Sequence, residues 1–387
     1  MRIISVAWNI YDDRLHEFCQ DCTGGGLVIK NVCEYIGRIC ESYLFIGQCK
    51  MPEMELGNIH IIGTESTSGL GDKCYDWKEK HLIEMSYAFE ESLRNIKPDF
   101  VNFHGIGELM QRCIKICVSS NIPYAFTEHL YIGLHKRFEG YDRAVSWEKQ
   151  VYNIPDINII AVSTGMKRKI MQDFPHIPEE NLWVIKNGTD FVPVQNEGNL
   201  RLEYGLENKK VLLCVGTILD RKNQCQVVRS FKLLTKLCQE NIKIIFCGKD
   251  RMSGMLQDSI LKNGLEDKLI YAGAVSSAEM KKYYTIADGL IMPSYAEGLS
   301  IAALEAIAYG LPVIMFEDSE CVEDLNDSKV VCLAKGRSDY SLADAVNEWF
   351  LRKWDRDYII NFSKGFSMER MAKNYVEYYN KKITLSK

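Results

Sequence analysis

The chain of 387 residues lacks long apolar runs, a strong net charge and a basic, apolar leader. No apolar run approaches the roughly 20 residues that a membrane-spanning helix needs. A net charge of −5 gives no reason to expect nucleic acid as a partner. A strand-like run starts at Arg2, so no secretory signal is expected. With no internal repeats either, the sequence predicts a globular, cytoplasmic protein, with peripheral contact at the inner face of a membrane left open.

Metal and redox motifs are also missing, although the chain has 14 cysteines. Cys214 and Cys247 fall in apolar, strand-like runs, which indicates buried free thiols in a reducing compartment. Cys19 and Cys22 form a lone C-x-x-C without a second pair at zinc spacing, and plain structural cysteines are the preferred reading over a metal or redox pair. No Asp-x-Asp motif follows a suitable strand, and Asp12-Asp13 is read as a solvated loop. The sequence therefore predicts no metal and no cofactor.

Apolar, β-rich runs alternate with helix-like stretches along the whole chain, which is long enough for two domains. Short apolar strands separated by helices predict parallel, doubly wound α/β sheets. The segment 191–205 becomes polar and loses periodicity, which indicates a domain junction. Helices are expected at 223–238, 276–286 and 367–383. The expected strands are 3–8, 43–46, 59–62, 100–103, 124–127, 157–162, 182–185, 211–215, 242–247, 269–271, 289–292, 312–316 and 330–333.

Residues 293–314 are the most informative stretch of the chain. A strand-like run at 289–292 precedes it, and helix-forming residues follow from 299 to 309. The helix is expected to end at Gly310, a good C-terminal residue, with Pro312 just beyond it. The pattern therefore predicts a strand, a turn and a helix.

Two carboxylates, Glu297 and Glu305, are eight positions apart in this stretch. At about 1.5 Å of rise per residue they would lie roughly 12 Å apart along a helix axis. Gly298 is expected to open the helix so that backbone N–H groups face an anion between the two acids. A nucleotide sugar has this layout of ribose, diphosphate and hexose. The alternative is a solvated surface helix in which the two glutamates have no role.

The stretch Pro293–Ile314 resembles the C-terminal signature of the retaining, nucleotide-sugar-dependent glycosyltransferases of family GT4, and the resemblance extends over nearly the whole chain. It implies the α/β fold called GT-B, with two Rossmann-like, doubly wound domains facing a central cleft. The implied parts are an acceptor-side domain at 1–195, a nucleotide-sugar-binding domain at 196–365, and a C-terminal helix at 366–387 that packs back on the first domain. The turn Asn187–Asp190 resembles the hinge that closes the first domain of the family.

The loop after the expected strand 211–215 resembles the family's binding loop for the donor diphosphate. Gly216 ends the strand, and Lys222 matches the family lysine. Thr217 stands where many members have arginine, and Arg221 is the candidate to replace that missing cation. The alternative is that Arg221 and Lys222 only cap a surface turn.

The resemblance implies further donor contacts in the second domain. Glu305 would hold the ribose hydroxyls. Glu297 would contact the transferred sugar or support positive charge at its anomeric carbon, and the choice between these roles stays open. Backbone groups that hold the nucleobase are expected at Gly273, Ala274 and Val275. Amides that meet the distal phosphate are expected at Gly298, Leu299 and Ser300.

In the first domain, Thr23–Gly26 opens an expected helix, as the glycine loop of many members does, and Gly25 and Gly26 are the expected donor contacts. A flexible turn without a ligand is the alternative. His129 ends an expected strand and matches the family histidine that contacts the donor sugar, unless it is a satisfied structural histidine. His104 is placed similarly, but its structural reading is preferred.

Without a divalent cation, Arg221, Lys222 and helix N-termini must meet the phosphate charge. The resemblance implies retention of anomeric configuration, and front-face displacement is favoured because no side chain is an obvious covalent nucleophile. The predicted function is metal-independent transfer of a sugar from a nucleotide-diphosphate sugar, UDP or GDP before other bases, to a hydroxyl of a carbohydrate or lipid-linked acceptor. Surface polysaccharide or glycoconjugate synthesis is the expected setting. The alternatives are a nucleotide-sugar epimerase on the same fold and a non-catalytic subunit that binds nucleotide sugar.

Overall fold

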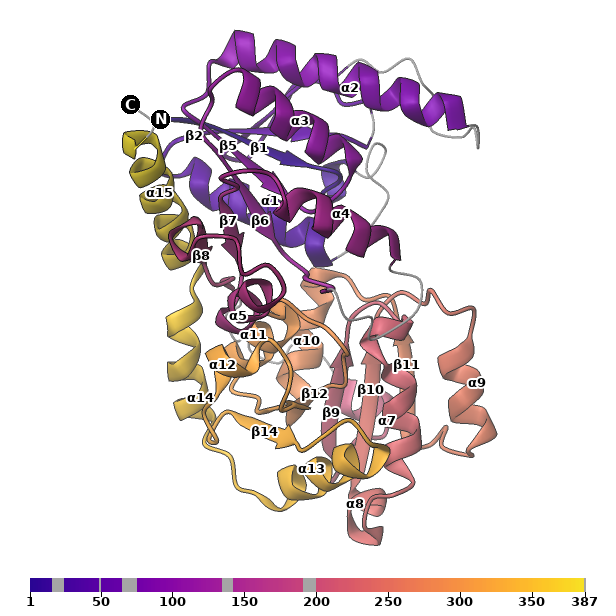
Figure 1. Ribbon diagram of the computed structural model, residues 1–387. Coiled ribbons are helices and arrows are strands. Elements are labelled where there is room, and N and C mark those ends of the chain that lie inside the picture. Colours follow the sequence, from indigo (N-terminus) through magenta and orange to yellow (C-terminus); the bar gives the residue numbers. More distant parts are fainter. Residues whose placement is uncertain (16–23, 49, 65–74, 134–141, 191–199, 386–387) are drawn as a thin grey trace. The chain divides into compact units, whose positions relative to one another are not determined.

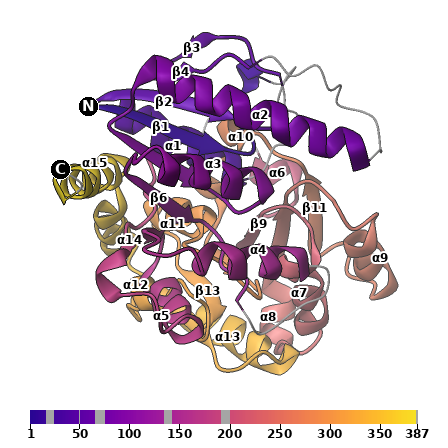
Figure 2. The ribbon, with the colours of Figure 1, turned by 45° about the horizontal axis from the view of Figure 1, so that its top comes forward.

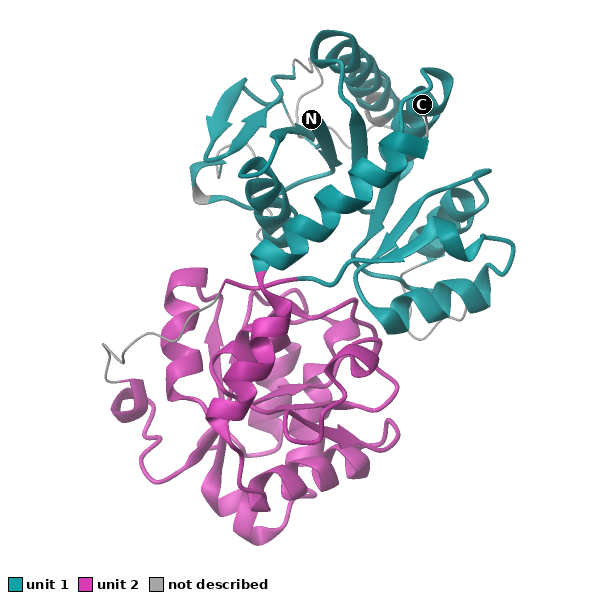
Figure 3. Cartoon of the chain, turned by 90° about the vertical axis from the view of Figure 1, so that its left-hand side faces the viewer, with its two compact units in different colours: residues 1–187, 368–387 teal, residues 188–367 magenta. Residues whose placement is uncertain are grey.

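A computed structural model describes residues 1–15, 24–48, 50–64, 75–133, 142–190 and 200–385. The chain forms two compact units (Figure 3). Unit 1 comprises Met1–Asn187 and Met368–Lys387, and unit 2 comprises Gly188–Ser367. The boundary expected between residues 195 and 196 lies outside the described residues, as do Cys19, Cys22 and Thr23.

Unit 1 contains a sheet that is parallel except at one edge (Figure 1). Among its described residues the strand order is β3-β4-β2-β1-β5-β6-β7-β8, and β3 pairs with β4 in the antiparallel direction. The short edge strand β3 was not predicted from the sequence, whereas the other strands were. The strands are β1 (Arg2–Ala7), β2 (Glu41–Ile46), β3 (Met54–Leu56), β4 (Ile59–Ile61), β5 (Phe100–His104), β6 (Tyr124–Glu128), β7 (Ile159–Ala161) and β8 (Leu182–Val184).

Aromatic side chains attach the helices of unit 1 to this sheet. The long helix α2 lies along it (Figure 2), with the ring of Phe89 at 5.5 Å from that of Phe45 in β2. The C-terminal helix α15 stacks Tyr379 on Phe100 of β5, at 4.6 Å between ring centroids. The helices of unit 1 are α1 (Gly24–Gly37), α2 (Tyr75–Ile96), α3 (Glu108–Ser119), α4 (Asp142–Tyr152), α5 (Thr164–Asp173) and α15 (Met368–Leu385), with 3₁₀ turns η1 (Asp13–Leu15) and η2 (Glu179–Asn181).

Unit 2 contains a wholly parallel sheet over its described residues, in the order β11-β10-β9-β12-β13-β14. Each of its strands was predicted from the sequence to within two residues at either end, because buried parallel strands are short, continuous apolar runs. The strands are β9 (Lys210–Val215), β10 (Ile242–Cys247), β11 (Leu269–Gly273), β12 (Gly289–Met292), β13 (Val313–Phe316) and β14 (Val331–Ala334).

The helices of unit 2 flank this sheet (Figure 1). The single helix expected at 223–238 is instead two, because the chain turns after Phe231 and the hydroxyl of Thr235 caps a new helix by accepting from the N–H of Cys238. The helices are α6 (Leu200–Glu203), α7 (Gln224–Phe231), α8 (Lys236–Asn241), α9 (Met255–Lys262), α10 (Ser277–Ile286), α11 (Ile301–Ala308), α12 (Val322–Leu325), α13 (Asp339–Leu351) and α14 (Arg356–Ser363), with 3₁₀ turns η3 (Asp220–Lys222) and η4 (Lys364–Phe366).

Three glycines follow or end neighbouring strands of unit 2 and let their backbones approach closely. Gly216 follows β9, Gly248 follows β10, and Gly273 ends β11. The N–H of Gly248 donates to the carbonyl of Gly273 at 2.7 Å. A Cβ on Gly248 would lie 2.0 Å from the carbonyl oxygen of Gly216, which no relaxed structure allows. The loops at this edge of the sheet are therefore packed backbone against backbone.

Gly248→Ala is expected to destabilise the protein by about 1–3 kcal/mol, because the added methyl group must push the loop after β9 away from β10. Urea unfolding of the full chain measures this change. Gly365→Ala is the matched control, because a Cβ there meets nothing within 4 Å. Equal stability of the two variants would contradict the close packing.

Candidate functional site

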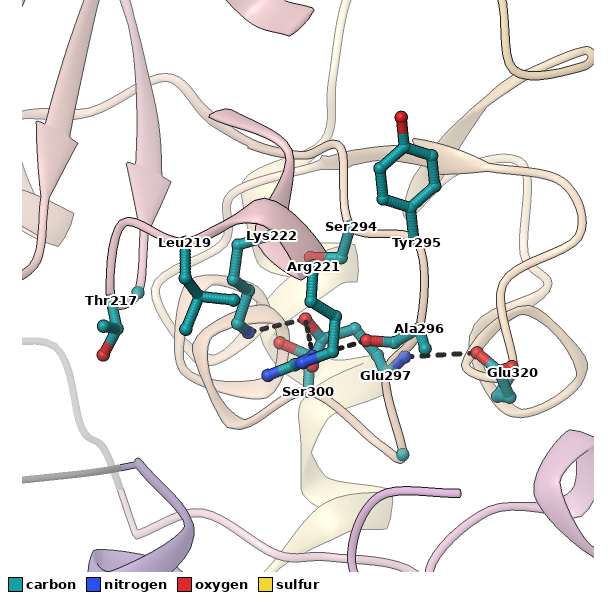
Figure 4. Close-up of polar contacts among 12 residues, drawn as sticks. Thr217, Leu219, Arg221, Lys222, Ser294, Tyr295, Ala296, Glu297, Ser300 and Glu320 are labelled. Atoms are coloured by element: carbon teal, nitrogen blue, oxygen red, sulfur yellow. Dashed lines mark hydrogen bonds and ion pairs between the residues drawn. The ribbon is translucent and has the colours of Figure 1, made fainter. Parts of the chain in front are cut away.

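The site in unit 2 is built from the loops that follow two neighbouring strands, β9 and β12 (Figure 4). Because the strands are parallel, both loops leave the same edge of the sheet. The loops are joined through their backbones: the N–H of Tyr295 donates to the carbonyl of Arg221 at 2.8 Å. The side chain of Arg221 returns a bond to the carbonyl of Ala296 at 2.5 Å.

Charged side chains of the two loops meet at Glu297. Nζ of Lys222 lies 2.5 Å from Oε1 of Glu297, and Nη1 of Arg221 lies 3.5 Å from the same oxygen. Figure 4 shows both basic side chains directed at this carboxylate. The three side chains are between 9% and 18% exposed, so water screens them little. The sequence prediction that these three residues share one site is consistent with this geometry.

The carboxyl of Glu297 remains ionised in this setting. Burial alone would raise its pKa, but the charges of Lys222 and Arg221 outweigh burial and hold the pKa of Glu297 below its ordinary value. Lys222 carries three N–H donors, and the bond to Glu297 uses one of them. Within the described part of the chain, the lysine therefore has donors left for a further anionic oxygen beside the carboxylate.

The loop that carries Glu297 is also held from its other side. Arg337 donates to the carbonyl of Ser294 at 2.6 Å and pairs with Asp318 at 2.7 Å. The carboxylate of Glu320 accepts from the N–H of Glu297 at 3.2 Å. These bonds fix the loop backbone, so the position of Glu297 does not depend on a ligand.

Helix α11 starts later than the sequence predicted. Its first residue is Ile301, and Ser300 is the N-cap, with its hydroxyl accepting from the N–H of Ala303 at 3.4 Å. Gly298 therefore lies in the loop and does not open the helix. Glu297 lies in the loop too, whereas Glu305 lies on the helix. The expected spacing of these two residues along one helix axis was therefore wrong, because the helical rise applies only from Ile301 onward.

Glu305 lies on α11 and is 9% exposed. The hydroxyl of Tyr284, on α10, donates to Oε2 of Glu305 at 2.8 Å. Burial raises the pKa of Glu305 to about 7, and the Tyr284 bond only partly opposes this. Glu305 is therefore half protonated near neutral pH, unlike Glu297.

The remaining expected donor contacts of unit 2 lie at three places. Gly216, with φ of 133°, adjoins Lys222: a Cβ on it would lie 3.4 Å from Cε of that lysine. Gly273 ends β11 with φ of 78° and has open space where a side chain would be. Ala274 and Val275 follow Gly273 in the sequence. Ala274 is exposed and Val275 is partly buried. Leu299 is only 2% exposed, so its side chain belongs to the packing of the loop.

In unit 1, the structure brings His129 and His104 together. His129 follows β6, and His104 ends the neighbouring strand β5. Nδ1 of His104 lies 3.0 Å from Nε2 of His129, and the rings stack at 5.3 Å between centroids. Burial lowers the pKa of His129 to about 4 and that of His104 well below its ordinary value. Both imidazoles are therefore neutral at pH 7.

Buried carboxyl groups hold the backbone that follows His129. Glu128 accepts from the N–H of Leu130 at 3.3 Å, and Tyr152 donates to its other oxygen at 2.5 Å. Glu148, on α4, accepts from the N–H groups of Ile132 at 2.7 Å and Gly133 at 3.0 Å. Burial raises the pKa of Glu128 well above its ordinary value and that of Glu148 to about 7. The segment 130–133 is thus fixed up to residues 134–141, which lie outside the described residues.

Of the two glycines expected as donor contacts at the start of α1, Gly26 has a packing role. Gly25 is exposed, whereas Gly26 is buried. A Cβ on Gly26 would lie 3.0 Å from the backbone of Ile10 and Tyr11, so the missing side chain lets α1 approach the segment after β1.

Comparisons with known proteins bear on both units. Residues 198–365 match the family described as Glycosyl transferases group 1, and residues 54–191 match Glycosyltransferase Family 4. Together the two matches span most of the chain. The chain belongs to the GT4-type glycosyltransferases.

An uncharacterized glycosyltransferase of Methanocaldococcus jannaschii is similar to this GT4-type chain, with 27% identity over 57% of this chain and 59% of that protein. A GDP-mannose-dependent alpha-(1-6)-phosphatidylinositol monomannoside mannosyltransferase of Mycobacterium tuberculosis is 27% identical over 41% of this chain and 42% of that protein. The similarity thus spans about half the length of these curated relatives.

An Anabaena protein solved in complex with UDP and glucose has the same fold, with a TM-score of 0.70 and 12% identity over 98% of this chain and 100% of that chain. The GT4-type chain therefore has the GT-B fold, as predicted from its sequence. Among the described residues, no helix is long and apolar enough to cross a membrane.

Sequence reasoning missed several residues that the structure places beside the candidate site residues of this GT4-type chain. They share one property: each contacts a candidate residue that is distant in sequence. Short motifs describe residues that are neighbours in sequence, so no motif could have indicated them. They are Tyr284 beside Glu305, Glu320 beside the N–H of Glu297, and Glu148 beside the segment after His129. Asn102 was missed as well, although it lies only two residues before its partner His104 in β5.

Glu305→Gln is expected to stabilise the protein at pH 8 and to lose that advantage as the pH falls toward 4.5. The folded-state pKa of about 7 lies above the ordinary 4.5, so Glu305 contributes stability only when protonated, below these values, and loses it as the pH rises through 7. Glutamine carries no charge and still accepts from Tyr284. A shift of this size corresponds to at most on the order of 3 kcal/mol.

Urea unfolding of wild type and variant at pH 8, 6.5 and 4.5 checks this expectation. Glu240→Gln is the control, since that side chain is 59% exposed. A stability difference that stays constant across the three pH values would show that folding does not raise the pKa of Glu305.

Proposed function

We propose that this chain is a retaining, metal-independent glycosyltransferase that moves a sugar from a nucleotide-diphosphate sugar to a hydroxyl of a carbohydrate or lipid-linked acceptor. The observation that carries the proposal is the cluster of Arg221, Lys222 and Glu297 at the edge of a parallel sheet. Membership of the GT4 type and the fold shared with a protein solved with UDP and glucose support it.

In the proposed reaction the donor diphosphate binds beside Arg221 and Lys222, whose buried N–H groups stabilise the charge that develops on the leaving phosphate. Glu297 lies against Lys222 and faces the transferred sugar near its anomeric carbon. Glu305 accepts hydrogen bonds from the ribose hydroxyls. Backbone groups from 273–275 hold the nucleobase, and those from 298–300 meet the distal phosphate.

The bond between the anomeric carbon and the phosphate oxygen breaks as the acceptor oxygen bonds to the same face of that carbon. The acceptor proton passes to the departing phosphate. The nucleotide part of the donor is proposed to be UDP or GDP, because a solved structure with this fold holds UDP and a relative is GDP-mannose-dependent. The proposed setting is glycoconjugate or surface polysaccharide synthesis in the cytoplasm, where the buried free thiols of Cys214 and Cys247 stay reduced.

An assay with UDP-glucose, UDP-galactose and GDP-mannose, a panel of sugar and lipid-linked acceptors, and excess EDTA tests this function. The expected result is release of nucleoside diphosphate that requires an acceptor, with the donor's α configuration kept in the product by proton NMR. An inverted product, or loss of activity in EDTA, contradicts the proposal. Donor turnover without an acceptor indicates an epimerase, and donor binding without turnover indicates a non-catalytic subunit.

Lys222→Met is expected to weaken binding of the matching nucleoside diphosphate roughly tenfold to a hundredfold, the loss expected for one charge-assisted hydrogen bond. Calorimetric titration measures the affinity. Lys236→Met is the matched control, because that side chain is 90% exposed.

Removing one partner of a buried ion pair also destabilises the fold. The double variant Lys222→Met/Glu297→Gln removes the unpaired charge and separates this effect from a lost ligand contact. Recovery of wild-type affinity in the double variant would show that Lys222 acts only on stability.

A further inference from the structure

His104 and His129, in unit 1, are the end of a longer hydrogen-bonded chain across β5 and β6. The hydroxyl of Thr127 donates to Oδ1 of Asn102 at 3.0 Å. Nδ2 of Asn102 lies 3.1 Å from Nε2 of His104, whose Nδ1 lies 3.0 Å from Nε2 of His129. The chain therefore runs from a hydroxyl through an amide to two imidazoles in series.

With the amide of Asn102 oriented so that its Nδ2 faces His104, the chain specifies where each imidazole carries its proton. An amide nitrogen only donates, so Nε2 of His104 must accept from Asn102. The single proton of neutral His104 is then on Nδ1, which donates to Nε2 of His129. Because Nε2 of His129 is an acceptor, the proton of neutral His129 is on its own Nδ1.

Burial requires these four groups to keep one common order of donors. Asn102 and Thr127 are fully buried, and His104 is 1% exposed, so water does not replace a partner. A buried donor facing a donor, or an acceptor facing an acceptor, is strongly unfavourable. Reversal would therefore require the amide of Asn102 and both imidazoles to change together.

We propose that His104 is a positioning residue that holds His129 in the Nδ1–H form, so that His129 acts on its ligand as a neutral hydrogen-bond donor and not as a base. This inference rests on the proposed function for the identity of that ligand, a hydroxyl of the donor sugar or an oxygen of the leaving group. It also requires that the acceptor proton goes to the departing phosphate, because Nε2 of His129 is occupied.

NMR of the full chain labelled with ¹⁵N at histidine tests the proton positions without any substrate. Long-range proton–nitrogen correlations separate protonated from unprotonated ring nitrogens, and His129→Gln and His104→Asn assign the two signals. His81 is an internal reference of the opposite form, because its Nε2 lies 2.8 Å from the carbonyl of Gly47, which can only accept. His176 is a second one, with Nε2 3.1 Å from the carbonyl of Tyr152.

The expected spectrum shows Nδ1–H for both His104 and His129, opposite to His81 and His176. A protonated Nε2 on His129 would mean that the chain of donors runs the other way and would overturn the proposal. Absence of glycosyl transfer in wild type would refute the proposed function, whereas this spectrum decides the proton positions by itself.

Kinetics of two variants test the positioning role. His104→Leu removes the donor to His129 and is expected to lower kcat at least roughly tenfold with little change in the donor KM, while the spectrum of His129 becomes a mixture of both forms. His104→Asn supplies an amide N–H in place of the ring Nδ1–H and is expected to restore much of kcat. The positioning role of His104 is overturned if kcat is unchanged in His104→Leu. It is also overturned if both variants fold and lose kcat to the same extent.

Discussion

The contact between Lys222 and Glu297 is the interaction on which the candidate site of unit 2 depends. Both side chains are largely buried, and either charge alone would be costly in that place. Their pairing therefore ties the loop after β9 to the loop after β12, and Arg221 adds backbone bonds to the same link. The result is a pair of cations held by contacts between the two loops, and the bonds among the described residues leave N–H donors of Lys222 for a ligand.

In unit 1, burial keeps a candidate site residue neutral, whereas in unit 2 the buried site residues are charged and paired. The carboxyl group of Glu148 accepts hydrogen bonds from two backbone N–H groups of the segment after His129. Burial lowers the pKa of His129, so its imidazole is neutral. One unit thus presents buried charge suited to a phosphate, and the other presents a neutral ring suited to a hydroxyl.

The sequence predicts the fold well because buried parallel strands are short apolar runs, and all but the antiparallel edge strand β3 follow from that pattern. It also predicts Arg221, Lys222 and Glu297 as one site, since each lies in a loop at a strand's carboxyl end. It misplaces the start of α11, because Ser300 was not recognised as the cap and Gly298 was taken as the helix opening. The partners of the site residues, such as Tyr284, could not be predicted, since they come from elements distant in sequence.

A crystal structure of the chain with UDP or GDP decides whether unit 2 binds a nucleoside diphosphate through these charges. We expect phosphate oxygens within hydrogen-bond distance of Nζ of Lys222 and the guanidinium of Arg221, with the ribose hydroxyls at Glu305. A nucleotide bound elsewhere, with Lys222 still in contact with Glu297 alone, would contradict this expectation.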